Sequence, residues 1–295
     1  MKDILFRKIT RLVGKAIGDF GLIAEGDRVL VALSGGKDSW TLLYALRHLQ
    51  RKAPIKFTLA AVTVHPGTAT FNVMPLKERL SREGIPGWTL QGRIVETVKE
   101  HLIEGTNPCS FCARLRRGII YGFAAEEGWN KIALGHHLDD FIETLLLNLF
   151  FNGAIKGMSP HLQSDDGRNE VIRPLVYVKE EMTRSFARHM GFPLLGCSCA
   201  YDGMTGSRRH WVKSLVARIE QEVPDVRSNL LASLGRVRLR HLFDSAATQK
   251  QYSTVLKSAL LPQIGFPPTL PSPARGEGFQ IPSFGGRGKG EGELD

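Results

Sequence analysis

Short, continuously apolar runs alternate along this chain with segments whose apolar positions recur at helical spacing. Clear runs occupy 28–33, 57–64 and 131–136, and weaker ones occupy 88–93 and 171–178. Runs of this length, bounded by turn residues, predict buried strands. Buried strands that alternate with helices predict a parallel sheet covered on both faces. We therefore expect a doubly wound α/β fold with a mostly parallel sheet of five strands and added helices.

Helical spacing of apolar residues marks the segments between these strands and at both ends of the chain. The segment 139–150 is strongly apolar and directly follows the strand at 131–136. The N-terminal segment alternates charged and apolar residues, as an ordinary amphipathic helix does. Further helices are expected at 1–20, 40–50, 95–104, 112–127, 178–190, 211–223 and 224–239.

The last part of the chain differs in composition from the rest. After about residue 263, glycine and proline dominate and no apolar periodicity remains, which predicts disorder. We therefore expect one folded domain at 1–245 and a low-complexity tail at 246–295. No apolar run reaches about eighteen residues, and the N-terminus lacks the pattern of a secretory signal. The expectation is a cytoplasmic protein with no membrane span.

The charge is strongly basic, with 39 lysines and arginines against 29 acidic residues and a net charge of +10. Basic residues cluster at 114–117, 208–213 and 236–241. A basic surface suits a polyanion such as a nucleic acid, although charge alone does not separate an RNA-binding protein from a merely soluble one. The residues we expect to contact phosphates are Arg114, Arg116 and Arg117.

A glycine-rich turn follows the first predicted strand and opens the next helix. It consists of Ser34, Gly35, Gly36, Lys37, Asp38 and Ser39. Two adjacent glycines let successive backbone N–H groups point at an anion, and the helix start adds its positive end. The lysine and the serine hydroxyls add further donors. The spacing is neither that of a Walker A loop nor that of a dinucleotide fingerprint, so the turn predicts a phosphate site of another kind.

The chain contains four cysteines in two close pairs, Cys109 with Cys112 and Cys197 with Cys199. In a cytosolic protein such pairs favour metal binding or redox chemistry over disulfides. Four thiolates can hold a structural zinc ion, whereas three thiolates on a [4Fe-4S] cluster leave one iron open. A catalytic persulfide pair without metal is a third alternative, and spacing alone leaves all three open.

A second polar turn, 135–140, ends one strand and opens a helix, so it should lie near the turn at 34–39. Gly135 would admit a nucleotide closely, and Asp139 and Asp140 would position magnesium or substrate. The alternative is structural, with Asp139 capping the helix and Asp140 complementing its dipole.

The glycine-rich turn, SGGKDS after a buried strand, resembles the PP-loop of the N-type ATP pyrophosphatase superfamily. That resemblance implies cleavage of ATP between its α- and β-phosphates and adenylation of a carbonyl oxygen. It also implies that Asp38 helps to hold Mg²⁺. RNA-modifying enzymes with a PP-loop carry GHxxDD at the second turn. By that resemblance the ATP site also includes Gly135, His136, Asp139 and Asp140.

The segment 109–153, with SDDG at 164–167 and VIRPL at 171–175, resembles the tRNA 2-thiocytidine synthetases. The similarity runs from about residue 17 to about residue 244. It implies a tRNA substrate modified at cytidine 32, a [4Fe-4S] cluster, a sulfur donor such as a cysteine desulfurase, and a homodimer. The implied cluster ligands are Cys109, Cys112 and Cys197, which together with Asp38 form the implied catalytic set.

Two segments depart from that family's pattern. Gly196-Cys197-Ser198-Cys199-Ala200 replaces Pro-Cys-x-x-Cys-Gly, so Cys199 can compete with Cys197. The second strand ends without an acidic residue, at 63–66. Two alternative functions remain. A lysidine-synthetase-like ligase would share the ATP chemistry but leaves the cysteines unexplained. A non-catalytic RNA-binding protein with structural zinc would not release AMP.

The three arginines that follow the first cysteine pair generate a first prediction. Replacing Arg114, Arg116 and Arg117 together by alanine should weaken tRNA binding. It should also flatten the salt dependence of the affinity, by about one unit of slope for each phosphate contact that the substitution removes. Binding of tRNA measured over a range of salt concentrations checks this, and unchanged binding by the triple variant would count against the assignment.

Overall fold

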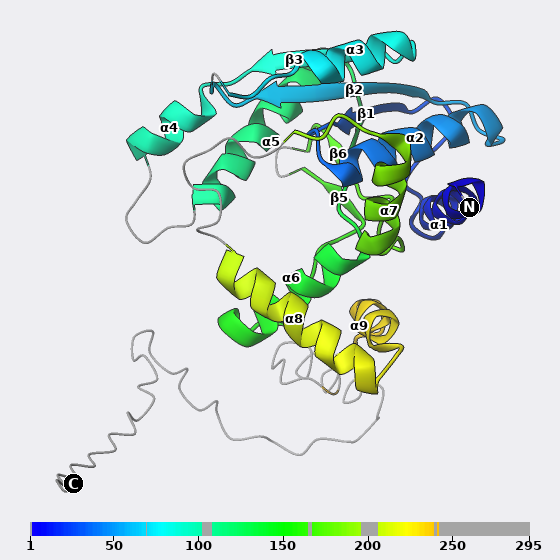
Figure 1. The fold of residues 1–295 in the computed structure, drawn as a ribbon, viewed down its shortest axis with the longest axis vertical. Coiled ribbons are helices and arrows are strands. Elements are labelled where there is room, and N and C mark those ends of the chain that lie inside the picture. The colour runs from blue at the N-terminus through cyan, green and yellow to red at the C-terminus, as the bar shows by residue number, and fades with distance from the viewer. Residues whose placement is uncertain are drawn as a thin grey trace, which may run out of the picture. The chain divides into compact units, whose positions relative to one another are not determined.

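A computed structural model describes residues 2–68, 70–101, 108–164, 167–195, 206–238 and 241. Its centre is a six-stranded sheet in the order β3-β2-β1-β4-β6-β5 (Figure 1). All neighbouring strands pair in parallel except β5 with β6. The strands are β1 (Arg28–Ala32), β2 (Thr58–His65), β3 (Gly87–Gln91), β4 (Lys131–Ala133), β5 (His161–Gln163) and β6 (Glu170–Ile172). The predicted fold class is confirmed.

The sheet differs from the prediction at one edge. The short antiparallel strand β5 was not expected, because its three residues are partly or fully exposed and give no apolar run. The strand expected at 171–178 ends at Ile172. Pro174 has no N–H to continue the ladder, and the chain turns so that the N–H of Val176 donates to the carbonyl of Arg173.

Nine helices are described around the sheet. They are α1 (Lys2–Phe20), α2 (Lys37–Lys52), α3 (Met74–Arg82), α4 (Ile94–His101), α5 (Pro108–Glu126), α6 (Leu138–Asn152), α7 (Glu180–Met190), α8 (Gly206–Glu222) and α9 (Val226–Leu234). Two of these helices have bounds whose difference from the expected ones bears on the site or on the C-terminal part. Helix α5 begins four residues early, at Pro108, so the first cysteine pair lies inside the helix. Within the range 224–239, where a helix was expected, only the residues of α9 are helical.

Strand alternation distributes the core over both faces of the sheet. On β1, Val29 and Val31 pack with apolar residues of α1, α2, α3 and α7, whereas Leu30 packs with residues of α4 and α5. Leu30 is aligned with Ala60 of β2 and Ile132 of β4, and all three are fully buried on one face. The runs are therefore apolar at every position because both faces are covered.

The chain order of the strands creates a switch point between β1 and β4. From β1 the chain moves outward to β2 and β3, and it then returns to the other side of β1 to form β4. Connections after β1 and after β4 therefore diverge at the carboxyl edge of the sheet, where open α/β sheets bind ligands. Both polar turns singled out in the sequence follow these two strands.

A smaller apolar cluster attaches α8 to α6. Leu138, Ile142 and Leu146 on α6 pack against Val212 and Val216 on α8. Among the described residues, no helix is both long enough and apolar enough to cross a membrane.

The position of Leu30 generates a stability prediction. Leu30→Ala removes a fully buried side chain from the centre of the sheet and should lower the free energy of unfolding by about 2–5 kcal/mol. Leu162→Ala is the matched control, because Leu162 lies on the edge strand β5 with 48% of its surface exposed, and its effect should stay within about 0.5 kcal/mol. Urea unfolding measures both, and equal effects would contradict this packing.

Candidate active site

The turn at 34–39 leaves the start of α2 open to an anion. Gly35 has a φ of +81°, a left-handed conformation that favours glycine. Gly36 is the N-cap of α2, and no side chain caps this end. The Ser39 hydroxyl instead donates to the carbonyl of Gly36 over 2.9 Å, and the Ser34 hydroxyl lies 3.2 Å from that of Ser39. The N–H groups of the first helical turn thus remain available to a phosphate.

The two polar turns touch through their backbones. A Cβ atom added to Gly135 would lie 2.9 Å from the amide nitrogen of Ser39 and 3.1 Å from the carbonyl carbon of Asp38. Such separations are too short for a side chain, so only glycine allows this approach. The structure therefore brings the segments 34–39 and 135–140 together at the switch point, as their positions after neighbouring strands predict.

The segment before the second cysteine pair is also tied to this turn. The N–H of Leu195 donates to the carbonyl of Gly35 over 3.0 Å, and a Cβ on Gly35 would lie 2.8 Å from the Cβ of Leu195. Trp40 on α2 donates from its indole N–H to the carbonyl of Pro193 over 3.2 Å. Cys197 follows Leu195 by two residues, but Cys197 and Cys199 lie outside the described residues.

Asp38 and Lys37 are held in a network with α7. The Lys37 ammonium lies 2.8 Å from Asp38 Oδ2 and 3.2 Å from Glu180 Oε1, and the Thr183 hydroxyl donates to Asp38 Oδ1. Burial would lower the pKa of Lys37, but its hydrogen bond to Asp38 and the charges of Asp38 and Glu180 raise it overall. Lys37 is therefore a cation beside the open end of α2.

Glu180 is the anionic centre of this network. It is paired with Lys213 of α8 and lies 2.9 Å from Arg184. Burial alone would raise the pKa of Glu180, but hydrogen bonds from Lys213 and Arg184 and the charge of Lys37 lower it to about 2. The carboxylate is thus ionised at neutral pH and fixes three cations around the first turn of α7.

Of the two aspartates in the second turn, Asp140 has the place at the start of α6 that the structural alternative predicts, whereas Asp139 does not cap this helix. His137, not Asp139, is the N-cap of α6, and the backbone N–H of His137 donates to Asp140 Oδ2 over 3.0 Å. Asp139 is buried and accepts the N–H of Glu180 over 2.7 Å and a hydrogen bond from Arg227. Asp139 therefore joins α6, α7 and α9 rather than capping its own helix.

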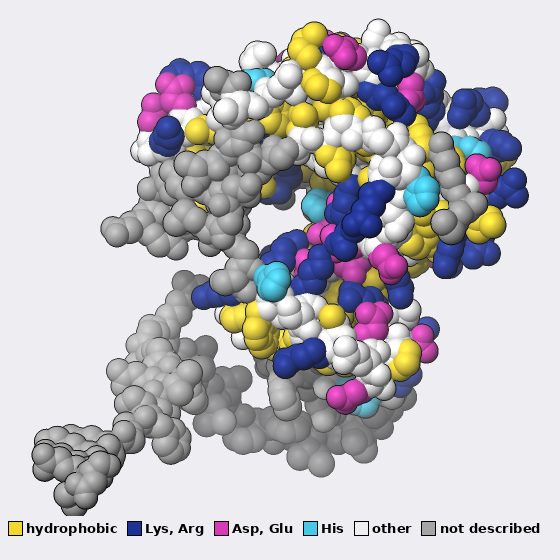
Figure 2. All heavy atoms as spheres, in the orientation of Figure 1, with side chains coloured by type: hydrophobic (Ala, Val, Ile, Leu, Met, Phe, Trp, Pro, Cys, Tyr) yellow, Lys and Arg dark blue, Asp and Glu magenta, His cyan; other side chains and the backbone are white. Residues whose placement is uncertain are grey.

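Three basic side chains of the C-terminal helices reach these carboxylates. Arg209 of α8 lies 3.2 Å from Asp140 Oδ1 and 3.3 Å from Glu143 Oε2, while Lys213 and Arg227 pair with Glu180 and Asp139. Basic and acidic side chains accordingly meet in the middle of the face shown in Figure 2. The basic cluster at 208–213 is evident in the sequence. The sequence analysis did not predict that two of its members, Arg209 and Lys213, pair with these carboxylates.

The two histidines of the second turn have different surroundings. The pKa of His136 is lowered to about 4, mainly by burial. The charge of Asp140 opposes this by raising the pKa, whereas the charges of Arg173 and Arg209 lower it further. Its Nδ1 accepts from Arg173 over 3.3 Å, as a neutral ring does. His137 is buried, with its Nε2 3.8 Å from Asp38 Oδ1 and its Nδ1 3.4 Å from Asp140 Oδ2. The His137 ring thus lies between the acidic residues of the two turns.

The cysteine ligand set is only partly described. Cys112 is a free, half-buried thiol that packs against the same apolar cluster as Ala32, the last residue of β1. The side chain of Cys109 lies outside the described part. Within that part, no group of three or more His, Cys, Asp or Glu side chains is arranged to hold a metal ion. Arg114 and Arg117 are exposed, whereas Arg116 is half-buried, and its Nε has no hydrogen-bond partner among the described residues.

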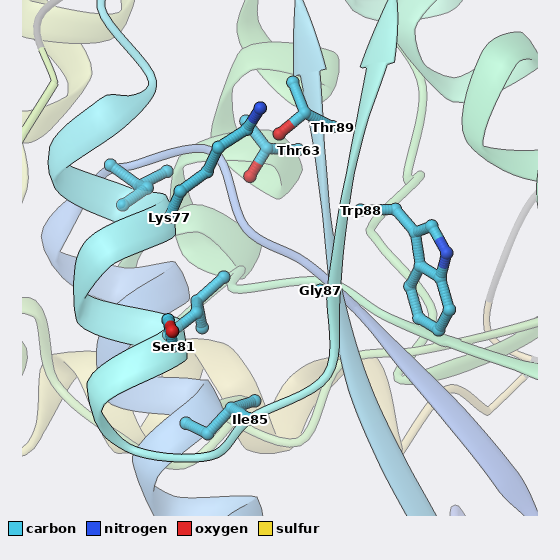
Figure 3. A pocket seen from close by; sticks show the side chains of 9 residues that line it. Thr63, Lys77, Ser81, Ile85, Gly87, Trp88 and Thr89 are labelled. Atoms are coloured by element: carbon cyan, nitrogen blue, oxygen red, sulfur yellow. The ribbon is translucent and has the colours of Figure 1, made fainter.

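Thr63, in the segment that lacks the family's acidic residue, donates to the carbonyl of Leu33 over 2.8 Å. It also lines a pocket of about 430 Å³ between α3 and the strands β2 and β3, together with Lys77 and Thr89 (Figure 3). This pocket lies at the β3 edge of the sheet and not at the switch point.

The model of the PP-loop domain family matches residues 1–194. The chain is 47% identical over 254 residues to the tRNA-cytidine(32) 2-sulfurtransferase of Syntrophotalea carbinolica, with 86% of this chain and 97% of that protein covered. The relative of the same name in Geobacter sulfurreducens is 46% identical over 242 residues, covering 82% and 94%. The chain belongs to the tRNA-cytidine(32) 2-sulfurtransferase family.

Membership of this family confirms the resemblance inferred from the two polar turns and the first cysteine pair. A solved structure supports the fold independently. The U34-tRNA thiolase of Methanococcus maripaludis, determined with its [4Fe-4S] cluster, aligns with a TM-score of 0.67 at 23% identity, covering 82% of this chain and 81% of that one. The sulfurtransferase chain therefore shares that fold.

The contact at Gly135 generates a prediction for this sulfurtransferase. Gly135→Ala inserts a Cβ against backbone atoms of Asp38 and Ser39, which cannot move without displacing the PP-loop. We expect ATP binding to weaken by about tenfold or more, a cost of about 1.4 kcal/mol or greater. Isothermal titration calorimetry with ATP on the full-length chain measures the loss.

Gly122→Ala is the matched control, because a Cβ at Gly122 on α5 would meet nothing within 4 Å. It should leave ATP affinity unchanged, and both variants should show cooperative thermal unfolding. Equal ATP affinities for the two variants would show that the two turns do not need this close contact.

Proposed function

We propose that this protein is an ATP-dependent sulfurtransferase that converts cytidine 32 of tRNA to 2-thiocytidine. The observation that carries the proposal is the 47% identity to a tRNA-cytidine(32) 2-sulfurtransferase over 97% of that protein's length. The open PP-loop at the switch point supports it, because the activation of a base oxygen needs a bound and oriented nucleoside triphosphate.

ATP phosphates would bind at the open N-terminus of α2. The free N–H groups of the first turn and the Lys37 ammonium are donors suited to phosphate oxygens. The close contact of Gly135 with the backbone of Asp38 and Ser39 keeps the second turn beside this phosphate turn. These groups would align the α-phosphate with the incoming base.

The residues around Asp38 fit a magnesium ion. Asp38 is partly exposed beside the phosphate turn, and carboxylate oxygen is the ligand that Mg²⁺ prefers. When bound there, magnesium would offset the charge that develops on the pyrophosphate leaving group. The Asp38 carboxylate also accepts hydrogen bonds from Lys37 and Thr183, but 24% of its side chain is exposed, whereas the Asp139 side chain is only 8% exposed and is paired with Arg227. We therefore assign Asp139 a positioning role between α6, α7 and α9.

In the first step, the cytidine O2 atom attacks the α-phosphorus of ATP and pyrophosphate leaves. The base oxygen then carries AMP, which makes it a good leaving group. In the second step, a sulfide sulfur forms a bond to C2, the C2–O bond breaks, and AMP departs. Lys37 and the end of α2 stabilise the negative charge on the phosphates during the first step.

The sulfide site is assigned to Cys109, Cys112 and Cys197. These three thiolates would hold a [4Fe-4S] cluster, which would supply the sulfide sulfur for the second step. Cys112 fits this assignment as a free, half-buried thiol at the α5 end that faces the carboxyl edge of the sheet. The hydrogen bond of Leu195 to Gly35 brings the chain two residues before Cys197 to the same edge.

The sulfur donor and the oligomeric state remain predictions of the sequence resemblance, and the cellular location remains a prediction from the pattern of the N-terminus and the length of the apolar runs. These predictions are a cysteine desulfurase or similar donor, a homodimer and the cytoplasm.

Cysteine variants of the full-length protein, purified without oxygen, test the proposal. We expect iron with acid-labile sulfide, AMP release that depends on tRNA, and 2-thiocytidine in the product tRNA. Cys109→Ala, Cys112→Ala and Cys197→Ala should each lose the cluster and reduce 2-thiocytidine formation by at least about a hundredfold.

Cys199→Ala is the control and should retain the cluster and the product. Stoichiometric zinc without iron would contradict the cluster assignment while leaving the ATP chemistry intact. Robust ATP binding without tRNA-dependent AMP release would contradict the enzymatic function itself.

A further inference from the structure

Three aromatic rings form an exposed cluster where the end of α6 meets the start of α8. Phe150 and Phe151 each lie with their ring centroid 5.9 Å from that of Trp211, at steep interplanar angles. Their exposed fractions are 48%, 41% and 47%. Figure 2 shows hydrophobic side chains gathered at this corner with basic ones beside them. We call Phe150, Phe151, Trp211 and Arg208 the aromatic patch.

The patch carries a positive charge that the described part of the chain does not neutralise. Arg208 is exposed, and its guanidinium lies 4.9 Å from the centroid of the Phe151 ring. No carboxylate among the described residues pairs with it. An exposed ring with an unpaired guanidinium at its face matches the chemistry of unpaired nucleotides, whose bases stack on aromatic rings and whose phosphates attract arginine.

Two helices connect the patch to the candidate active site. Phe150 follows Asp140 by ten residues on α6, a separation of about 15 Å along a helix. On α8, Arg209 reaches Asp140 and Glu143, while its neighbour Arg208 belongs to the patch. The apolar cluster between α6 and α8 holds both helices together. The patch is therefore held at a fixed distance from the site where the base is activated.

We propose that the aromatic patch binds unpaired nucleotides of the tRNA loop that flank the target cytidine. Their bases stack on Trp211 and Phe151, and a neighbouring phosphate contacts Arg208. This inference rests on the proposed function, because it takes tRNA as the substrate. The Arg208 charge, which pairs with no carboxylate among the described residues, favours RNA over a second copy of this chain, whose own patch would carry the same charge.

Binding of an anticodon stem-loop RNA that contains cytidine 32 tests the patch. The full-length protein carries the double substitution Arg208→Ala with Trp211→Leu, and affinity is measured by fluorescence anisotropy. Removal of one stacked base and one phosphate interaction should weaken binding by about tenfold or more. The matched control is Arg218→Ala with Ile219→Ala, which removes an exposed arginine and an exposed apolar residue from the other half of α8, and should bind within about threefold of the parent.

Single substitutions at Trp211 separate stacking from packing. Trp211→Phe keeps an aromatic face and should retain most of the affinity, whereas Trp211→Leu keeps apolar volume without that face and should lose it. Equal affinities for these two variants would overturn the stacking role. If a Trp211 variant does not unfold cooperatively, Arg208→Gln alone must still weaken RNA binding, and unchanged binding would overturn the proposal.

Three further outcomes identify the alternatives. If the parent protein releases AMP with tRNA but the double variant binds RNA as the control does, the patch proposal fails and the function stands. If the parent releases no AMP with tRNA, the function fails and the patch proposal fails with it. If the double variant changes the molar mass in solution without changing RNA affinity, the patch is a contact between copies of the chain and the proposal is overturned.

Discussion

The close backbone approach between the PP-loop and the turn after β4 is the constraint on which the site depends. Gly135 allows it because a Cβ there would stand 2.9 Å from the Ser39 amide nitrogen. The contact is possible only where β1 and β4 are neighbours in a parallel sheet, since both turns then leave from the same edge. Sheet order, the absence of a side chain at Gly135 and the open start of α2 thus act together to shape the candidate phosphate site.

Much of this arrangement was predictable from local sequence patterns, and particular residues show why. Leu30 and its neighbours are apolar because both faces of β1 are covered, so the strand was evident. The short strand β5 has no apolar run and owes its existence to pairing with β6, so it was missed. The turn at 34–39 was identified because its glycines and its place between strand and helix are both local features.

Interactions between distant segments could not be predicted in the same way. Glu180 lies 143 residues after Lys37, and no periodicity relates them, yet they are 3.2 Å apart. Arg227 and Asp139 are likewise paired only because α9 packs on α6. From its sequence position, Asp139 was expected to cap the helix or to help position magnesium or substrate at the ATP site. The observed pairing makes it the joint of three helices, a role that depends on tertiary packing.

The basic cluster at 208–213 acquires two meanings once it is placed on a helix. Residues four apart share one face, so Arg209 and Lys213 both turn toward the carboxylates of the candidate active site, where they pair with Asp140, Glu143 and Glu180. Arg208 and Trp211, three apart, share the neighbouring face and remain exposed. A positive net charge therefore does not measure how much charge is available to RNA. The charge available to RNA is that of the basic side chains that point away from the site. On α8 this is Arg208, which lies beside an aromatic surface suited to unpaired bases.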